Sequence, residues 1–155
     1  MSLFFRALLA FLALPGTVAF LVPYLLLDPA DRSFNALRLV ALLPGIVGLL
    51  WCVWSFYIEG RGTLAPWSPP RHLVVCGLYR FSRNPMYVSV ILILWGWAVG
   101  FRSRALALYA LGVMLMFHLR VVLGEEPWLA RTHGEAWHRY RAAVPRWFGR
   151  ARGQA

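Results

Sequence analysis

The fold follows from residues 86–123, which read "MYVSVILILWGWAVGFRSRALALYALGVMLMFHLRVVL". This stretch holds two apolar runs, Met86 to Phe101 and Ala105 to Leu123, separated by only three polar residues. A helix needs about 20 apolar residues to cross the hydrocarbon core of a membrane; the second run approaches that length and the first is shorter. A connection this short leaves the two helices antiparallel. The stretch therefore predicts a tight helical hairpin over about 86–123.

Two more apolar runs precede the hairpin, Leu3 to Leu27 and Leu37 to Ile58. The chain has 155 residues, of which 60% are hydrophobic, so it is long enough for one compact domain. We predict an all-α integral membrane protein with four to five transmembrane helices in a single domain. Within it, residues 1–58 form the N-terminal helices, 59–85 a cytoplasmic loop, and 86–147 the hairpin and tail.

The first apolar run has a second interpretation. Arg6 precedes it and the small residues Thr17, Val18 and Ala19 suit a cleavage site, so it resembles a signal peptide. The run continues past these residues to Leu27, which favours a membrane helix. Both interpretations stay open at this point.

The arginines predict the orientation. All 16 basic residues are arginines, against 6 acidic residues. With both termini in the cytoplasm, the outer side carries Arg32, Arg38, Arg102 and Arg104, and most of the other arginines lie inside. Arginine concentrates on the cytoplasmic side of membrane proteins, so this arrangement is the expected one. Arginines placed between apolar runs suit anionic headgroups or a small anion, and we do not expect nucleic acid as a partner.

The tail contains a predicted surface helix. In "GEEPWLARTHGEAWHRYRAAVPRWF" one helix side would carry five residues, while arginines and a glutamate occupy much of the rest. This pattern is typical of an amphipathic helix that lies in the membrane interface. Gly134 weakens the helix and Pro145 is expected to end it. A headgroup anchor without chemistry is an equally good interpretation of the tail. The five residues are Trp128, Leu129, Thr132, Ala136 and Tyr140.

Charged residues at the end of the hairpin suggest a site. Arg120 closes the last apolar run, and Glu125 and Glu126 follow it. Two carboxylates at the membrane boundary would be repelled by an anionic inner leaflet, which suggests a ligand with positive charge or hydroxyl groups. On an α-helix Arg120 points more than about 100° away from Glu125, although its long side chain can still bridge to it, and the two glutamates diverge by about 100° from each other. Arg120 is also explained by contact with headgroups.

A second polar group stands before the third apolar run, in "GLYRFSRNPMYVSV", residues 77–90. Pro85 suits the first turn of a helix, and Asn84 suits its N-cap. A helix N-terminus beside Arg83 attracts a carboxylate or phosphate. Tyr79 and Tyr87 offer ring faces to a cation or a purine.

Metal chemistry has no support in the sequence. Cys52 and Cys76 are the only cysteines; one lies in an apolar run and the other in a loop. They predict neither a disulfide nor a zinc site. We therefore expect no metal ligands.

Two segments resemble a known family. "GLYRFSRNPMY" is similar to the G-x-Y-x-x-x-R-[HN]-P-x-Y signature of isoprenylcysteine carboxyl methyltransferases and related bacterial phospholipid-methyltransferase-like membrane proteins. "EEPWLARTHGEAWHRYRAAVPRW" resembles their E-E-x-x-L-x-x-x-[FH]-G-x-x-[YW]-x-x-Y-x-x-x-V-P-R segment. The resemblance covers about residues 71–147, half of the chain, and the two motifs occur in the expected order with a hairpin between them.

The resemblance implies S-adenosylmethionine as cofactor and a lipid-borne methyl acceptor, in a bacterial inner membrane with both termini cytoplasmic. Arg83 and Glu126 join the cofactor contacts because of their charge. Asn84 replaces a histidine of the isoprenylcysteine enzymes, which argues against a prenylated protein as substrate. The cofactor-binding candidates are Leu73, Val74, Tyr79, Arg83, Asn84, Pro85, Met86, Tyr87, Glu125 and Glu126.

The catalytic candidates are Arg120 and Glu125. Arg120 stands one residue earlier, relative to Glu125, than the substrate-contacting arginine of the isoprenylcysteine enzymes. Methyl transfer is an in-line displacement that depends on positioning and on exclusion of water.

We predict methyl transfer from S-adenosylmethionine to a lipophilic acceptor: a phospholipid amine, an isoprenoid carboxylate or a similar group. Two alternatives remain, a membrane reductase of related helical fold that uses NADPH and a non-catalytic membrane scaffold.

Overall fold

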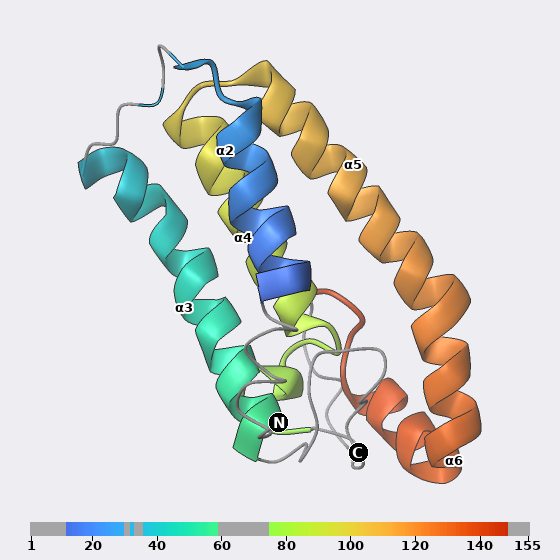
Figure 1. Ribbon diagram of the computed structural model, residues 1–155. Coiled ribbons are helices and arrows are strands. Elements are labelled where there is room, and N and C mark those ends of the chain that lie inside the picture. The colour runs from blue at the N-terminus through green and yellow to red at the C-terminus, as the bar shows by residue number, and fades with distance from the viewer. Residues whose placement is uncertain (1–11, 30–31, 33–35, 59–74, 149–155) are drawn as a thin grey trace.

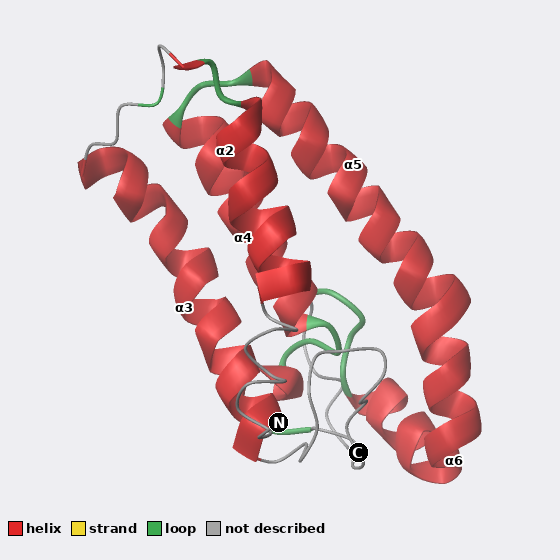
Figure 2. Cartoon of the chain, viewed as in Figure 1, coloured by secondary structure: helices red, strands yellow, loops and turns green. Residues whose placement is uncertain are grey.

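The computed structural model describes residues 12–29, 32, 36–58 and 75–148. Every regular element in this part of the chain is a helix, so the all-α prediction is confirmed there (Figure 2). The elements in order are η1 Leu12–Leu21, α2 Val22–Leu26, α3 Ala36–Ile58, η3 Gly77–Arg80, α4 Pro85–Gly100, α5 Arg104–Arg120, η4 Val121–Glu125 and α6 Glu126–Ala143.

Four apolar helical segments make the body of the molecule. In Figure 1, α3 lies along one side of α4, α5 runs along the other side, and η1 with α2 lies across the front of α4. Within the described residues two helical stretches, Ala36–Ser55 and part of Arg104–Ala143, are long and apolar enough to cross a membrane. Pro15–Leu26 and Pro85–Gly100 are shorter apolar helices. The predicted hairpin is present as α4 and α5.

Glycines bring α3 and α4 into backbone contact. A Cβ atom built on Gly45 would lie 2.6 Å from the backbone nitrogen of Ile93, and one on Gly96 would lie 2.5 Å from the carbonyl oxygen of Ala41. Small residues at such positions let membrane helices approach closely, because lipid supplies no hydrophobic drive for helices to associate. The four-residue spacing of Gly96 and Gly100 is typical of this role. Gly96 fulfils it, whereas a Cβ at Gly100 would make only ordinary contacts.

The N-terminal helix is fixed to the hairpin through two of its backbone carbonyl groups. Pro23 has no N–H, so one carbonyl of the preceding turn lacks its usual donor. Trp97 Nε1 donates to Ala19 O at 3.0 Å, and Tyr109 Oη donates to Val18 O at 3.1 Å. Unpaired backbone groups are costly where no water reaches them. These two bonds therefore dock η1 on both arms of the hairpin.

The tail helix α6 differs from its predicted face. Gly134 has φ 48° and ψ −123°, a non-helical conformation that kinks α6 in its middle. Thr132 and Ala136 are exposed and Trp128 is 40% exposed, while Trp137 and Tyr140 are buried. The prediction of one continuous face from Trp128 to Tyr140 was wrong, because the kink rotates the second half of the helix relative to the first.

We expect the contact between α3 and α4 to be intolerant of a single added carbon. Gly45→Ala should lower the free energy of unfolding by about 1–3 kcal/mol, because its Cβ would overlap backbone atoms of α4. Gly112→Ala is the matched control in α5, where an added Cβ meets nothing within 4 Å. Unfolding of the two variants in detergent measures the difference, and equal stability would contradict the packing described.

Candidate functional site

A π-helical segment joins α5 to α6 and brings together two candidate residues. In η4, Val121–Glu125, the backbone forms hydrogen bonds between residues five apart, which widens the turn and brings positions five apart nearer to one face than in an α-helix. Arg120 Nε accordingly donates to Glu125 Oε1 at 2.8 Å. A regular α-helix would place these side chains more than about 100° apart, with only the length of Arg120 to bridge them, and the π-helical segment brings them closer.

Tyr87 completes this cluster from the first turn of α4. Its hydroxyl donates to Glu125 Oε1, and it accepts a bond of 3.2 Å from Arg120 Nε. The ring of Tyr87 stacks on Phe117 of α5, with 4.3 Å between ring centroids. The side chain of Arg120 is 54% exposed and that of Glu125 is 33% exposed, so a ligand can reach both. We call Tyr87, Arg120 and Glu125 the tyrosine cluster.

The neighbouring carboxylate, Glu126, forms a second and more buried group. Arg146 donates to both of its oxygens, from Nε at 2.7 Å and from Nη2 at 2.9 Å. Nη1 of Arg83 lies 3.0 Å from Glu126 Oε1, and the side chains of this pair are only 7% and 10% exposed. The two adjacent glutamates therefore diverge, as predicted. Glu125 pairs with one arginine, and Glu126 pairs with two others. We call Arg83, Glu126 and Arg146 the arginine cluster.

Pairing shifts the pKa values in the arginine cluster. Burial acts to raise the pKa of Glu126, but the hydrogen bonds from Arg146 and the charge of Arg83 outweigh it, so this pKa lies below its ordinary value of 4.5. Burial lowers the pKa of the Arg83 guanidinium, partly offset by Glu126. The hydrogen bond to Glu126 raises the pKa of Arg146. The cluster therefore stabilises the charged, deprotonated form of Glu126.

The segment after α6 crosses the start of α4 and fixes two candidates. The backbone N–H of Arg83 donates to Pro145 O at 2.9 Å, and Asn84 Nδ2 donates to Arg146 O at 3.0 Å. Asn84 occupies the N-cap position of α4 as predicted, but its side chain makes no cap bond to the helix, so that part of the prediction was wrong. Pro85 does occupy the first turn of α4.

Two further candidates lie away from both clusters. Tyr79 is 6% exposed and packs with Cys52, while Met86 contacts that group and the main core. Tyr140 Oη donates to Tyr79 O at 2.7 Å, which ties α6 to η3. Leu73 and Val74 lie outside the described residues.

Sequence reasoning gave no role to several residues that build the site. Arg146 ends the V-P-R part of the resemblance, which could have drawn attention to it. Trp137 lies under the guanidinium of Arg83, 5.3 Å from its Cζ to the ring centroid. Trp147 Nε1 donates to His118 Nδ1 at 3.3 Å, which ties the tail to α5. Trp137 stands at the [YW] position of the second motif, which could have drawn attention to it, whereas only the tertiary contact singles out Trp147.

The comparisons with known proteins place the chain in a family. A family model described as phospholipid methyltransferase matches residues 37–136, from α3 into α6. The chain belongs to the phospholipid methyltransferase family. The resemblance found in the two motifs is confirmed, and the match extends it to α3. Membership indicates a methyltransferase that acts on membrane lipid. Neither a curated protein nor a solved structure matches the chain.

The π-turn predicts that the protein tolerates the deletion of one residue within η4. Deleting exposed Leu123 removes the extra residue of η4, so an ordinary α-helix would keep Arg120 and Glu125 together, now four residues apart. Deleting exposed Leu115 rotates the helix by about 100° and turns Phe117 and Val121 out of the core. We expect less than about 1 kcal/mol of lost stability for the first and more than about 3 kcal/mol for the second. Thermal unfolding in detergent compares the stability of the two deletion variants. Equal losses of stability would show that the π-turn is not a removable insertion.

The lowered pKa of Glu126 predicts that the protein loses stability in acid. Its folded-state pKa is lowered, so its contribution is present above pH 4.5 and disappears as the pH falls through the folded value. At pH 7, Glu126→Gln should cost about 3 kcal/mol, because it leaves buried guanidinium groups without their carboxylate. That difference from the unmodified protein should shrink below pH 4.5. Glu135→Gln on the exposed side of α6 is the control. A difference that stays constant down to pH 3, measured by urea unfolding, would contradict this account.

Proposed function

We propose that the protein transfers a methyl group from S-adenosylmethionine to a lipophilic acceptor in the membrane. One observation carries the proposal: Tyr87, Arg120 and Glu125 meet at one end of an apolar hairpin in a chain of the phospholipid methyltransferase family. These residues come from different helices, and their partly exposed groups combine a carboxylate, a guanidinium and an aromatic face. That set fits a small zwitterionic ligand with hydroxyl groups.

The bound cofactor supplies an electrophilic methyl group. Glu125 accepts hydrogen bonds, so it suits the ammonium or ribose hydroxyls of the cofactor. Tyr87 presents its ring edge and hydroxyl beside Glu125, and Phe117 holds that ring in place. Arg83 and Asn84 stand immediately before α4. We propose these residues as cofactor contacts, with Glu126 holding Arg83 and with Tyr79, Pro85 and Met86 shaping the surrounding wall.

Arg120 and Glu125 are the proposed catalytic residues. Arg120 is half exposed at the end of α5, beside the lipid-facing side chains of that helix. It suits an anionic group of the acceptor, and its bond to Glu125 holds both side chains on one side of η4. An amine acceptor must lose a proton as the methyl group arrives, and Glu125 is the nearest carboxylate in the cluster to receive it.

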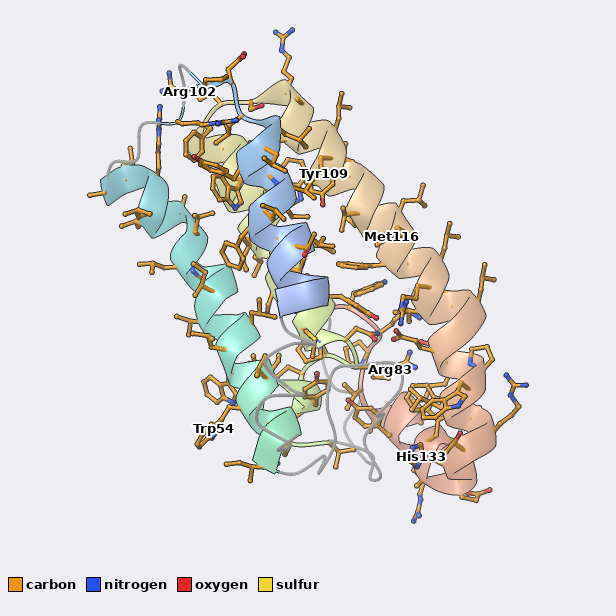
Figure 3. The ribbon with its side chains drawn as sticks, viewed as in Figure 1. Trp54, Arg83, Arg102, Tyr109, Met116 and His133 are labelled. Carbon is orange, nitrogen blue, oxygen red and sulfur yellow. The ribbon has the colours of Figure 1, made fainter. Side chains whose placement is uncertain are left out.

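The membrane arrangement supports a lipid acceptor. Exposed apolar side chains lie on α3 and α5, among them Met116 and Trp54, and Trp54 points away from the bundle in Figure 3. We propose that the four apolar segments span a bacterial inner membrane with both termini cytoplasmic and with α6 in the interface. The tyrosine cluster then lies at the cytoplasmic end, where a lipid headgroup meets a cofactor from solution. The acceptor is a phospholipid amine, an isoprenoid carboxylate or a similar group.

Binding in detergent tests the proposal. S-adenosylmethionine and its demethylated product should raise the unfolding temperature, and NADPH should not. Glu125→Gln and Tyr87→Phe should each weaken the affinity about tenfold, because each removes a hydrogen bond within the cluster. Glu135→Gln should leave the affinity unchanged.

Two results would overturn the assignment. Stabilisation by NADPH alone would favour the reductase, and no response to any of the three compounds would favour the scaffold. Transfer of a labelled methyl group into extracted membrane lipid then identifies the acceptor class.

A further inference from the structure

Two buried side chains beside the tyrosine cluster have donors without acceptors. Nε and Nη1 of Arg83 and Nε1 of Trp137 make no hydrogen bond, and no other buried side-chain nitrogen or oxygen of the described residues is in this state. The ion pair of Arg83 with Glu126 is close, but the N–H does not point at the carboxylate. Leaving buried donors unpaired costs about 1–3 kcal/mol each, so native structures contain few of them.

The unmet donors come from two side chains in contact. The guanidinium of Arg83 lies over the ring of Trp137, which is 2% exposed. Arg83 lies between the start of α4 and α6 in Figure 3. Every unpaired group of this pair is a donor, so a group that satisfies them must accept hydrogen bonds.

Charge distinguishes the candidates for that acceptor. Arg83 and Arg146 share the single carboxylate of Glu126, and the charge of Arg141 also acts on Arg83. An ordered water would satisfy the donors and leave the excess positive charge. A carboxylate satisfies the donors through two oxygens and neutralises that charge, and charge-assisted bonds of this kind are about twice as strong as neutral ones.

We propose that Arg83 and Trp137 form a carboxylate pocket, and, resting on the proposed function, that this pocket takes the α-carboxylate of S-adenosylmethionine. Glu125 and Glu126 are adjacent, so the pocket begins one residue from the tyrosine cluster. One small molecule can therefore place its amino-acid end against the arginine cluster and its sulfonium and ribose beside Tyr87 and Glu125. Arg83 has a predicted role as a cofactor contact; Trp137 is a new specificity-determining residue.

Decarboxylated S-adenosylmethionine isolates the effect, because it lacks only the carboxylate. The unmodified protein should bind S-adenosylmethionine at least about tenfold more tightly than the decarboxylated compound. Trp137→Phe keeps an aromatic ring under Arg83 and removes the N–H, so it should reduce that ratio several-fold. Trp128→Phe is the matched control: the same substitution on the same helix, at an exposed tryptophan that contacts His133. It should leave the ratio unchanged.

Each outcome bears on the proposal. Equal affinity of the unmodified protein for the two compounds means that an ordered water serves the donors, and it overturns the pocket even if Trp137→Phe fails to fold. A ratio that Trp137→Phe does not change also overturns it. In both cases binding of S-adenosylmethionine itself leaves the proposed function standing. No binding of either compound overturns the function and the pocket together. Binding of methylthioadenosine, which lacks the amino-acid part, should be the same in all three proteins and confirms that the variants are folded.

Discussion

Two adjacent carboxylates at the end of an apolar helix are the constraint on which the functional end depends. A carboxylate there must be paired, because burial without a partner is costly and the boundary offers little water. Glu125 is held by Arg120 and Tyr87, which join α5 to α4. Glu126 is held by Arg146 and Arg83, which join α6 to the tail and to the residues before α4. The pairing of these two residues thus sets how the hairpin, the surface helix and the tail meet.

The π-turn determines which side chains those carboxylates meet. A π-turn places one additional residue between Arg120 and Glu125 without rotating their faces apart. Such turns often occur at functional sites, and here the turn brings Arg120 Nε to 2.8 Å from Glu125 Oε1. The apolar helices are held by different contacts: glycines bring α3 against α4, and Trp97 and Tyr109 donate to backbone carbonyls of η1. Tight packing there supports a site whose side chains remain partly exposed.

The two clusters differ in burial and therefore in what they can do. The tyrosine cluster is accessible and holds the acid–base groups, so it suits contact with ligands that come and go. The arginine cluster is nearly closed and carries more positive than negative charge, so it suits one fixed anionic group. A ligand with an anionic end and a cationic centre matches this order of environments.

The sequence by itself determined the helices and the family. Long apolar runs leave the backbone no alternative to internal hydrogen bonding in lipid, so α3, α4 and α5 were predictable within a few residues. Pro85 at the start of α4 and the two motifs were equally visible. Only the tertiary structure decided the partners. Sequence spacing assumed regular helices, so it could not show the π-turn that brings Arg120 to Glu125, and it misjudged the buried face of α6 beyond Gly134. It placed Asn84 at the N-cap correctly but could not show that the side chain binds the distant carbonyl of Arg146 and makes no cap bond. Residues that are distant in sequence come into contact only after the chain has packed, so local sequence patterns do not reveal these contacts.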